Sequence, residues 1–273
     1  MQAEQAKRVT APRAQSEVHD VLRPAGRAGF TARGVLYLLV GSLALRIAFG
    51  DGGGQADRQG ALRQIAAQPF GTALLWLLVV GIAGMALWRA AQAVLAEGED
   101  GAGKRLASAG RAVFYAAVCW GTATFAAGSG GSSSSDSKSK DWTATVLEKP
   151  GGRWIVGAAG VALCAAGAVI AFRAVRRKFL EKLETGRMGA RMRQAVTAAG
   201  AGGGTARGAV YVGAGVFVLV AAVRFDPHEA KGLDDTLRSF AHTPAGPWLL
   251  VVTAAGLLLF GLFSFASARW RRF

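Results

Sequence analysis

Arginine and tyrosine recur together at three places in the chain. Each tyrosine follows an arginine by four residues, and the six residues are Arg33, Tyr37, Arg111, Tyr115, Arg207 and Tyr211. This spacing places both side chains of a pair on one face of an α-helix. A guanidinium can hold a phosphate through two parallel hydrogen bonds, and a phenol hydroxyl can donate another. The pattern is therefore a candidate site for a lipid phosphate or another anion.

The same pattern also has a purely structural interpretation, which the sequence favours. Long arginine side chains reach from the end of a membrane-spanning helix to the headgroups, and tyrosine is enriched at the same interface. On this interpretation the pairs anchor their helices and recognise no particular ligand. The sequence leaves both interpretations open.

Long apolar segments carry these pairs. Six such segments occur, at 33–49, 71–95, 109–127, 153–172, 207–223 and 246–267. Each is close to the ~20 residues that cross the hydrocarbon of a bilayer as a helix. Because 52% of the residues are hydrophobic, we expect an all-α integral membrane protein with six transmembrane helices rather than soluble domains.

The formal net charge of +15 is distributed unevenly between the two sides of these segments. On the side of the termini, Lys and Arg outnumber Asp and Glu by 22 to 8, whereas the other side has 10 against 9. Connections rich in Lys and Arg stay in the cytoplasm. We therefore expect a multi-pass protein of the cytoplasmic (inner or plasma) membrane with both termini inside and with anionic lipid headgroups as partners. A nucleic-acid footprint with interleaved aromatics on a soluble face is missing, which argues against nucleic acid.

Three copies of one unit make up most of the chain. The arginine of each pair precedes a proline by 36, 39 and 37 residues in turn, and a tryptophan follows each proline. Before the proline lies a short amphipathic stretch, such as 61–68, which we expect to form a helix on the outer membrane surface. Each copy crosses the membrane twice, so the copies are parallel two-helix repeats with approximate threefold pseudo-symmetry.

Polar stretches set the expected boundaries of the units. We expect a polar N-terminal tail over 1–23, repeat one over 24–98, repeat two over 99–178, a basic cytoplasmic linker over 179–203 and repeat three over 204–273. Residues 1–15 are expected to be unstructured, and Pro24 is expected to end a short helix before the first span. The Ser-rich stretch 128–140 is expected to be a flexible loop.

Glycines at helical spacing in the apolar segments favour close packing of the helices. They are Gly34 and Gly41, Gly81 and Gly84, Gly157 and Gly160, Gly208 and Gly215, and Gly256 and Gly261. The same segments contain no Asp, Glu or His, so intramembrane histidines cannot ligate haem and a buried proton relay is not expected. We expect a protein that is not an enzyme, with no catalytic residue, no metal site and no cofactor.

One acidic cluster lies in a predicted external connection. It contains Asp226, His228, Glu229, Asp234, Asp235 and His242. A divalent-ion site is conceivable there, because carboxylate and imidazole groups ligate such ions. Lys231 and Arg238 lie between them, so solvated charge is the favoured interpretation.

The repeated motifs resemble a known family. An opening GRAGFTARGVLYLLVG at 26–41, an LRQIAAQPFG element at 62–71 and a WRA exit at 88–90 are similar to a bacterial membrane family catalogued as domain of unknown function 1206. That family consists of three copies of a two-helix unit, and the resemblance covers residues 24–270. It implies a topology and no activity. We expect a lipid-binding, scaffolding or partner-docking protein, with a membrane protein as a conceivable partner; the alternative is a small channel or carrier for an anion or amphiphile.

Overall fold

Six long helices dominate the computed structural model, which describes residues 2–49, 55–94, 102–128, 135–241 and 246–272. They are α1 (Gln2–Ala48), α3 (Gly71–Val94), α4 (Ala102–Ala126), α6 (Gly152–Val175), α7 (Ala190–Arg224) and α9 (Gly246–Trp270). The described residues form no extended strand, and one isolated bridge pairs Leu183 with Arg271. The expectation of an all-helical protein is confirmed.

Within the residues that the structure describes, five helical segments are long and apolar enough to cross a membrane. They are Arg23–Ala48, Gly71–Val94, Gly152–Val175, Ala190–Arg224 and Trp248–Trp270. The sequence predicts six, and the structure supports five. The helix outside this set is α4, whose apolar stretch carries Arg111, Thr122 and Thr124 and is correspondingly more polar. The protein therefore has the helices of a multi-pass membrane protein.

Three short helices connect the long ones, one in each unit, as the sequence predicts. They are α2 (Arg58–Ala66), α5 (Ser135–Leu147) and α8 (Leu233–Ala241). At the start of α2, the buried carboxylate of Asp57 accepts a hydrogen bond from the backbone N–H of Gly60 at 2.8 Å, which caps the helix. Leu62 and Ile65 are buried, so the apolar face of α2 packs inward. Helix α5 begins inside the stretch predicted to be a flexible loop.

The N-terminal region differs from the prediction. Helix α1 begins at Gln2 and continues through Pro24, so the expectations of an unstructured segment over 1–15 and of a helix end at Pro24 are wrong. Pro24 removes one helical hydrogen bond, but the turns that follow it pack tightly on α3. A Cβ added to Gly84 of α3 would lie 2.7 Å from the carbonyl oxygen of Ala25. This contact holds the chain helical after the proline.

The predicted linker 179–203 is folded onto the third unit. It contains the 3-10 helices η1 (Lys178–Lys182) and η2 (Thr185–Arg187), and its second half forms the first turns of α7. Leu183 and Met188 are buried in a cluster with Phe260 and Phe263 of α9. The backbone N–H of Glu184 donates to the carbonyl of Trp270 at 2.8 Å. The expected boundary at residue 203 thus lies inside α7.

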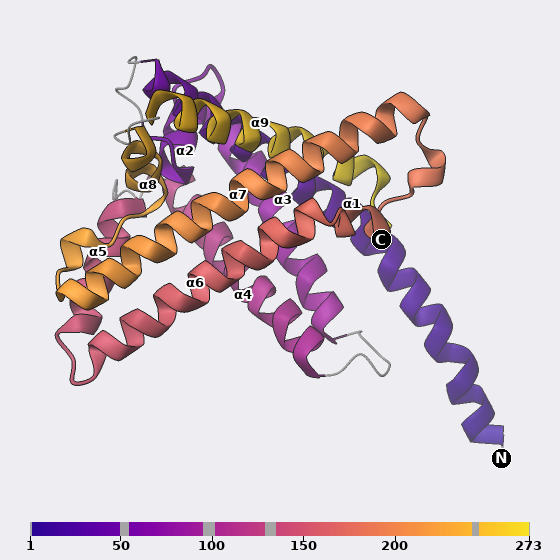
Figure 1. The fold of residues 1–273 in the computed structure, drawn as a ribbon. Coiled ribbons are helices and arrows are strands. Elements are labelled where there is room, and N and C mark those ends of the chain that lie inside the picture. Colours follow the sequence, from indigo (N-terminus) through magenta and orange to yellow (C-terminus); the bar gives the residue numbers. More distant parts are fainter. Residues whose placement is uncertain (1, 50–54, 95–101, 129–134, 242–245, 273) are drawn as a thin grey trace.

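The long helices form an arc. In order, α4 packs on α3, α3 on α1, α1 on α9, α9 on α7, and α7 on α6. Figure 1 shows α6 and α7 side by side along most of their length. In the described part of the chain, α4 and α6 do not pack along each other, although α1 and α3, and α7 and α9, do. The middle unit therefore departs from the other two, and threefold pseudo-symmetry is not confirmed.

Glycines let the helices of the arc approach closely. On α6 and α7, a Cβ added to Gly167 would lie 2.7 Å from the carbonyl oxygen of Gly208. Between α7 and α9, a Cβ at Gly203 would lie 2.4 Å from the backbone nitrogen of Phe260. Of the predicted packing glycines, Gly157 alone has an ordinary nearest neighbour, at 3.9 Å. Backbone-to-backbone contacts of this kind are typical of membrane helix interfaces.

Gly167→Ala is expected to destabilise the protein, because its new methyl group meets backbone atoms of α7 that cannot move independently. The expected loss is about 1–3 kcal/mol, the usual cost of overpacking. Gly157→Ala on the same helix is the control and should be neutral or slightly stabilising, since Ala is the better helix former. Thermal unfolding in detergent compares the two variants. Equal midpoints would contradict the close α6/α7 contact.

Candidate functional site

Five of the six residues in the arginine–tyrosine pattern meet in the interior of the arc. They are Arg33 and Tyr37 of α1, Tyr115 of α4, and Arg207 and Tyr211 of α7, and each is half-buried. The sixth, Arg111, is exposed, and its charge acts on Arg89 and Arg271 from the edge of this group. The tyrosines on the first helices of the three units thus all lie in this one group. We call these five residues, together with Arg89 and Arg271, the central cluster.

Arg33 joins three helices. Its Nε donates a hydrogen bond to the hydroxyl of the buried Ser264 on α9 at 3.1 Å. Its guanidinium also hydrogen-bonds the hydroxyl of Tyr115. The guanidinium carbon lies 4.5 Å from the ring centroid of Phe30 and 5.0 Å from that of Phe260. Aromatic faces attract such a cation, so these rings hold the guanidinium in place.

Arg207 lies among three aromatic rings. Its guanidinium carbon is 5.7 Å from the ring centroid of Tyr37, 5.3 Å from Tyr211 and 5.0 Å from Phe260. Its Nη2 is 3.5 Å from the hydroxyl of Tyr211, a long hydrogen bond. Phe260 therefore lies within reach of both Arg33 and Arg207. The Nε of Arg207 is buried and has no hydrogen-bond partner.

Two members of the cluster were missed in the sequence. Arg89 lies near the end of α3, 4.5 Å from the ring centroid of Trp88, and its Nη1 donates to the side chain of Gln92 at 3.0 Å. Arg271 follows α9 and lies 4.7 Å from the centroid of Phe30 and 5.0 Å from that of Trp88. The sequence does contain a signal that could have identified them: each arginine occurs where the second helix of its unit ends, and Arg89 belongs to the WRA motif.

The described part of the chain supplies no carboxylate partner for the positive charge of the cluster. In the described part of the chain, none of Arg33, Arg89, Arg207 and Arg271 forms an ion pair. Beyond the end of α9, burial and repulsion by Arg89 and Arg33 lower the pKa of Arg271 to about 9. The Nε atoms of Arg89 and Arg271 are buried without a partner, as is that of Arg207. Buried charge without a counter-charge is costly, and an anion would relieve the cost.

The acidic cluster has a structural role. Asp234 is buried; its carboxylate accepts hydrogen bonds from the backbone N–H of Ala56 at 2.7 Å and from Nε of Arg238 at 2.9 Å. Asp235 forms an ion pair with Lys140 at 2.9 Å. These contacts join α8 to the segment before α2 and to α5. Among the described residues no three His, Cys, Asp or Glu side chains are grouped to hold a metal ion, and His242 lies outside those residues.

Comparison with known proteins identifies the repeated unit. The model of the family Domain of Unknown Function (DUF1206) matches three times, at residues 28–96, 106–177 and 202–271. The chain is also similar to the Uncharacterized protein YxxB of Bacillus subtilis (strain 168), with 30% identity over 244 residues, which cover 88% of this chain and 87% of that protein. No solved structure matches. The resemblance to a three-copy family is thus confirmed.

Ser264→Ala is expected to destabilise the protein, because it leaves the Nε of the half-buried Arg33 without its acceptor. The expected loss is about 1–3 kcal/mol, the cost of an unsatisfied buried group. Ser267→Ala is the matched control: Ser267 is equally buried on α9 but donates only to the carbonyl of Phe263 in its own helix. Thermal unfolding in detergent measures both, and a larger effect at Ser267 would argue against the Arg33–Ser264 contact.

Proposed function

We propose, from the premise that this chain belongs to the DUF1206 family, that it is a non-enzymatic membrane protein whose central cluster binds the phosphate of an anionic lipid. One observation carries the proposal: four arginines converge from α1, α3, α7 and the C-terminal end, and none of them forms an ion pair among the described residues. A lipid bound in this way would serve a scaffolding or partner-docking role in the membrane.

The chemistry of the cluster suits a phosphate better than a single-charge anion. Arg33 and Arg207 approach the same ring, Phe260, so their guanidinium groups can converge on one ligand. The hydroxyls of Tyr115 and Tyr211, which contact these arginines, can donate further hydrogen bonds. A phosphate offers several oxygens to such a set of donors and matches the planar fork of arginine.

The arc offers the lipid an approach from one side. Helices α4 and α6 do not pack along each other in the described residues, so a lipid arriving between them breaks no helix packing. Their exposed side chains are apolar, including Val113 and Phe114 of α4 and Val161 and Phe172 of α6. Acyl chains can lie against these side chains while the headgroup meets Tyr115.

The second candidate is a small carrier or channel for an anion or amphiphile. The observation that favours it is the position of Arg33, Arg89 and Arg207 inside segments able to span the membrane. Intramembrane charged residues commonly mark a substrate pathway. Reconstituted vesicles distinguish the two candidates: flux of an anion that depends on Arg33 and Arg207 favours transport, whereas tight lipid retention without flux favours binding.

We further propose that α4 crosses the membrane together with the five more apolar helices, and that the protein resides in the cytoplasmic membrane with both termini inside, from the excess of basic residues on the side of the termini. Cysteine labelling tests this orientation after Cys119 and Cys164 are replaced by Ala. Gly186→Cys, in the exposed connection before α7, should react with an impermeant reagent only from the cytoplasmic side. Glu148→Cys, exposed at the end of the middle unit's short helix, should react only from outside. The reverse result would overturn the orientation.

Replacing Arg33 and Arg207 together by Gln should reduce binding of anionic lipid about tenfold or more, because charge-assisted hydrogen bonds are lost. Mass spectrometry of lipid that co-purifies with the gently solubilised protein measures the loss. Arg153→Gln is the control, since Arg153 is exposed and donates to a backbone carbonyl far from the cluster.

Arg33→Lys with Arg207→Lys separates folding from recognition. This variant keeps both charges but loses the forked hydrogen bonds, so its lipid content should fall between the wild type and the Gln variant. Wild-type lipid content in a folded Gln variant would reject the central cluster as the binding site.

A further inference from the structure

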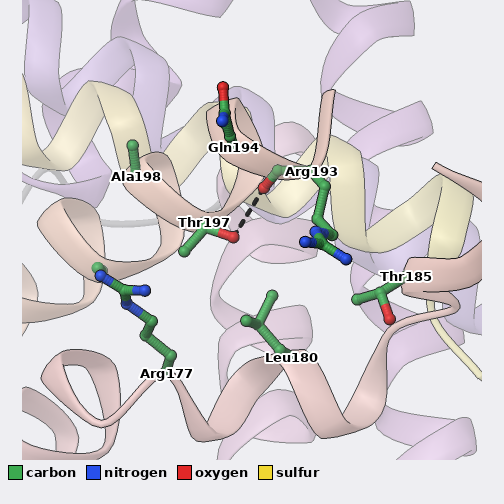
Figure 2. Close-up of a pocket in the computed structure, with 8 residues that line it drawn as sticks. Arg177, Leu180, Thr185, Arg193, Gln194, Thr197 and Ala198 are labelled. Carbon is green, nitrogen blue, oxygen red and sulfur yellow. Dashed lines mark hydrogen bonds between the residues drawn. The ribbon is translucent and has the colours of Figure 1, made fainter. Parts of the chain in front are cut away.

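A second basic site lies outside the central cluster, in the segment that joins the second and third units. A groove of about 490 Å³ is lined by Arg177, Leu180 and Thr185 on one side and by Arg193, Gln194, Thr197 and small residues of α7 on the other. Figure 2 shows these side chains around the groove, with Leu180 between the two arginines. The volume is within the usual range of small-molecule sites, roughly 300–1,000 Å³.

The two arginines are free to bind an anion. Neither Arg177 nor Arg193 forms an ion pair in the described part of the chain. In contrast, the neighbouring Arg187 pairs with Glu184 at 2.9 Å. From 173 to 193 the chain has eight basic and two acidic residues, so the local field attracts anions.

The backbone on both sides of the groove adds to this preference. Arg177 has φ 53° and ψ 23°, the left-handed conformation that is unfavourable for a residue other than glycine. Such strain persists where the surrounding structure determines it and is frequent at ligand sites. Across the groove, the first turn of α7 contains no acidic residue. The N-cap residue, Gly189, has no side chain that could accept hydrogen bonds from the backbone N–H groups of this turn. The positive end of this helix dipole is therefore not neutralised by its own residues.

Polar and apolar groups alternate in the groove. Thr185 and Gln194 can donate hydrogen bonds, while the hydroxyl of Thr197 already donates to the carbonyl of Arg193 at 2.7 Å. Leu180 on one side, and Ala198 and Ala201 on the other, supply apolar contacts. This combination suits a phosphate attached to an apolar group better than a free inorganic ion.

We infer that this groove binds a phosphate ester with an apolar substituent, through Arg177 and Arg193. A phosphatidic-acid headgroup of the adjacent membrane surface and a soluble phosphate ester share this chemistry. The inference does not rest on the proposed function, because no residue of the groove belongs to the central cluster.

The test counts bound dioctanoyl phosphatidic acid on the detergent-solubilised full chain by native mass spectrometry. Arg177→Gln with Arg193→Gln should lose one bound molecule relative to the wild type, with affinity at that site about tenfold weaker or more. Arg187→Gln is the matched control: it lies in the same segment, outside the groove lining, and should keep the wild-type count.

The count also separates this site from the central cluster. If both sites bind, the wild type holds two molecules and the groove variant one; if only the groove binds, the wild type holds one and the variant none. An unchanged count and affinity in a variant with wild-type thermal stability would overturn the inference, as would equal binding of zwitterionic dioctanoyl phosphatidylcholine.

Competition identifies the source of the phosphate. Displacement of the probe by glycerol 1-phosphate at similar concentration would favour a soluble ester as the ligand. Failure of glycerol 1-phosphate to compete would favour a lipid, because the apolar side chains of the groove then contribute to the affinity. Both results support the groove as a phosphate-ester site, and each assigns it to one of the two sources.

Discussion

Uncompensated positive charge is the constraint on which the interior of this protein depends. Arg33 and Arg207 are held by aromatic faces and hydroxyl groups, and no carboxylate neutralises them in the described part of the chain. A cation over an aromatic face gains on the order of 1–2 kcal/mol, which is less than the cost of desolvating a guanidinium. In the proposed function, the bound anion would supply the counter-charge that the described residues do not.

Close helix packing is what brings these charges together. Gly203 and Gly167 let α9 and α6 approach the backbone of α7, and the α1/α9 contact joins the two halves of the arc. Larger residues at these glycines would push the helices apart and separate Arg207 from Phe260. The same packing that stabilises the bundle thus sets the geometry of the cluster.

The middle unit is specialised. Its two long helices, α4 and α6, stand at the two ends of the arc, and its arginine, Arg111, is exposed while its tyrosine contacts Arg33. Among the long helices of the described residues, α4 is also the one outside the five able to span a membrane by length and composition. In the middle unit the arginine of the repeated pair is therefore exposed, and its two long helices leave one side of the arc without helix packing.

The sequence by itself determined the helical class, the three copies and the short connecting helices, because hydropathy, the Arg-to-Pro spacing and glycine placement are local or periodic signals. It also identified Tyr37, Tyr115 and Tyr211 as one repeated position. Only the tertiary structure decided that Arg89 and Arg271 join them, that Arg111 is exposed, and that residues 179–203 fold onto α9. These outcomes depend on which helices become neighbours, and contacts between residues far apart in the chain leave no periodic pattern within it.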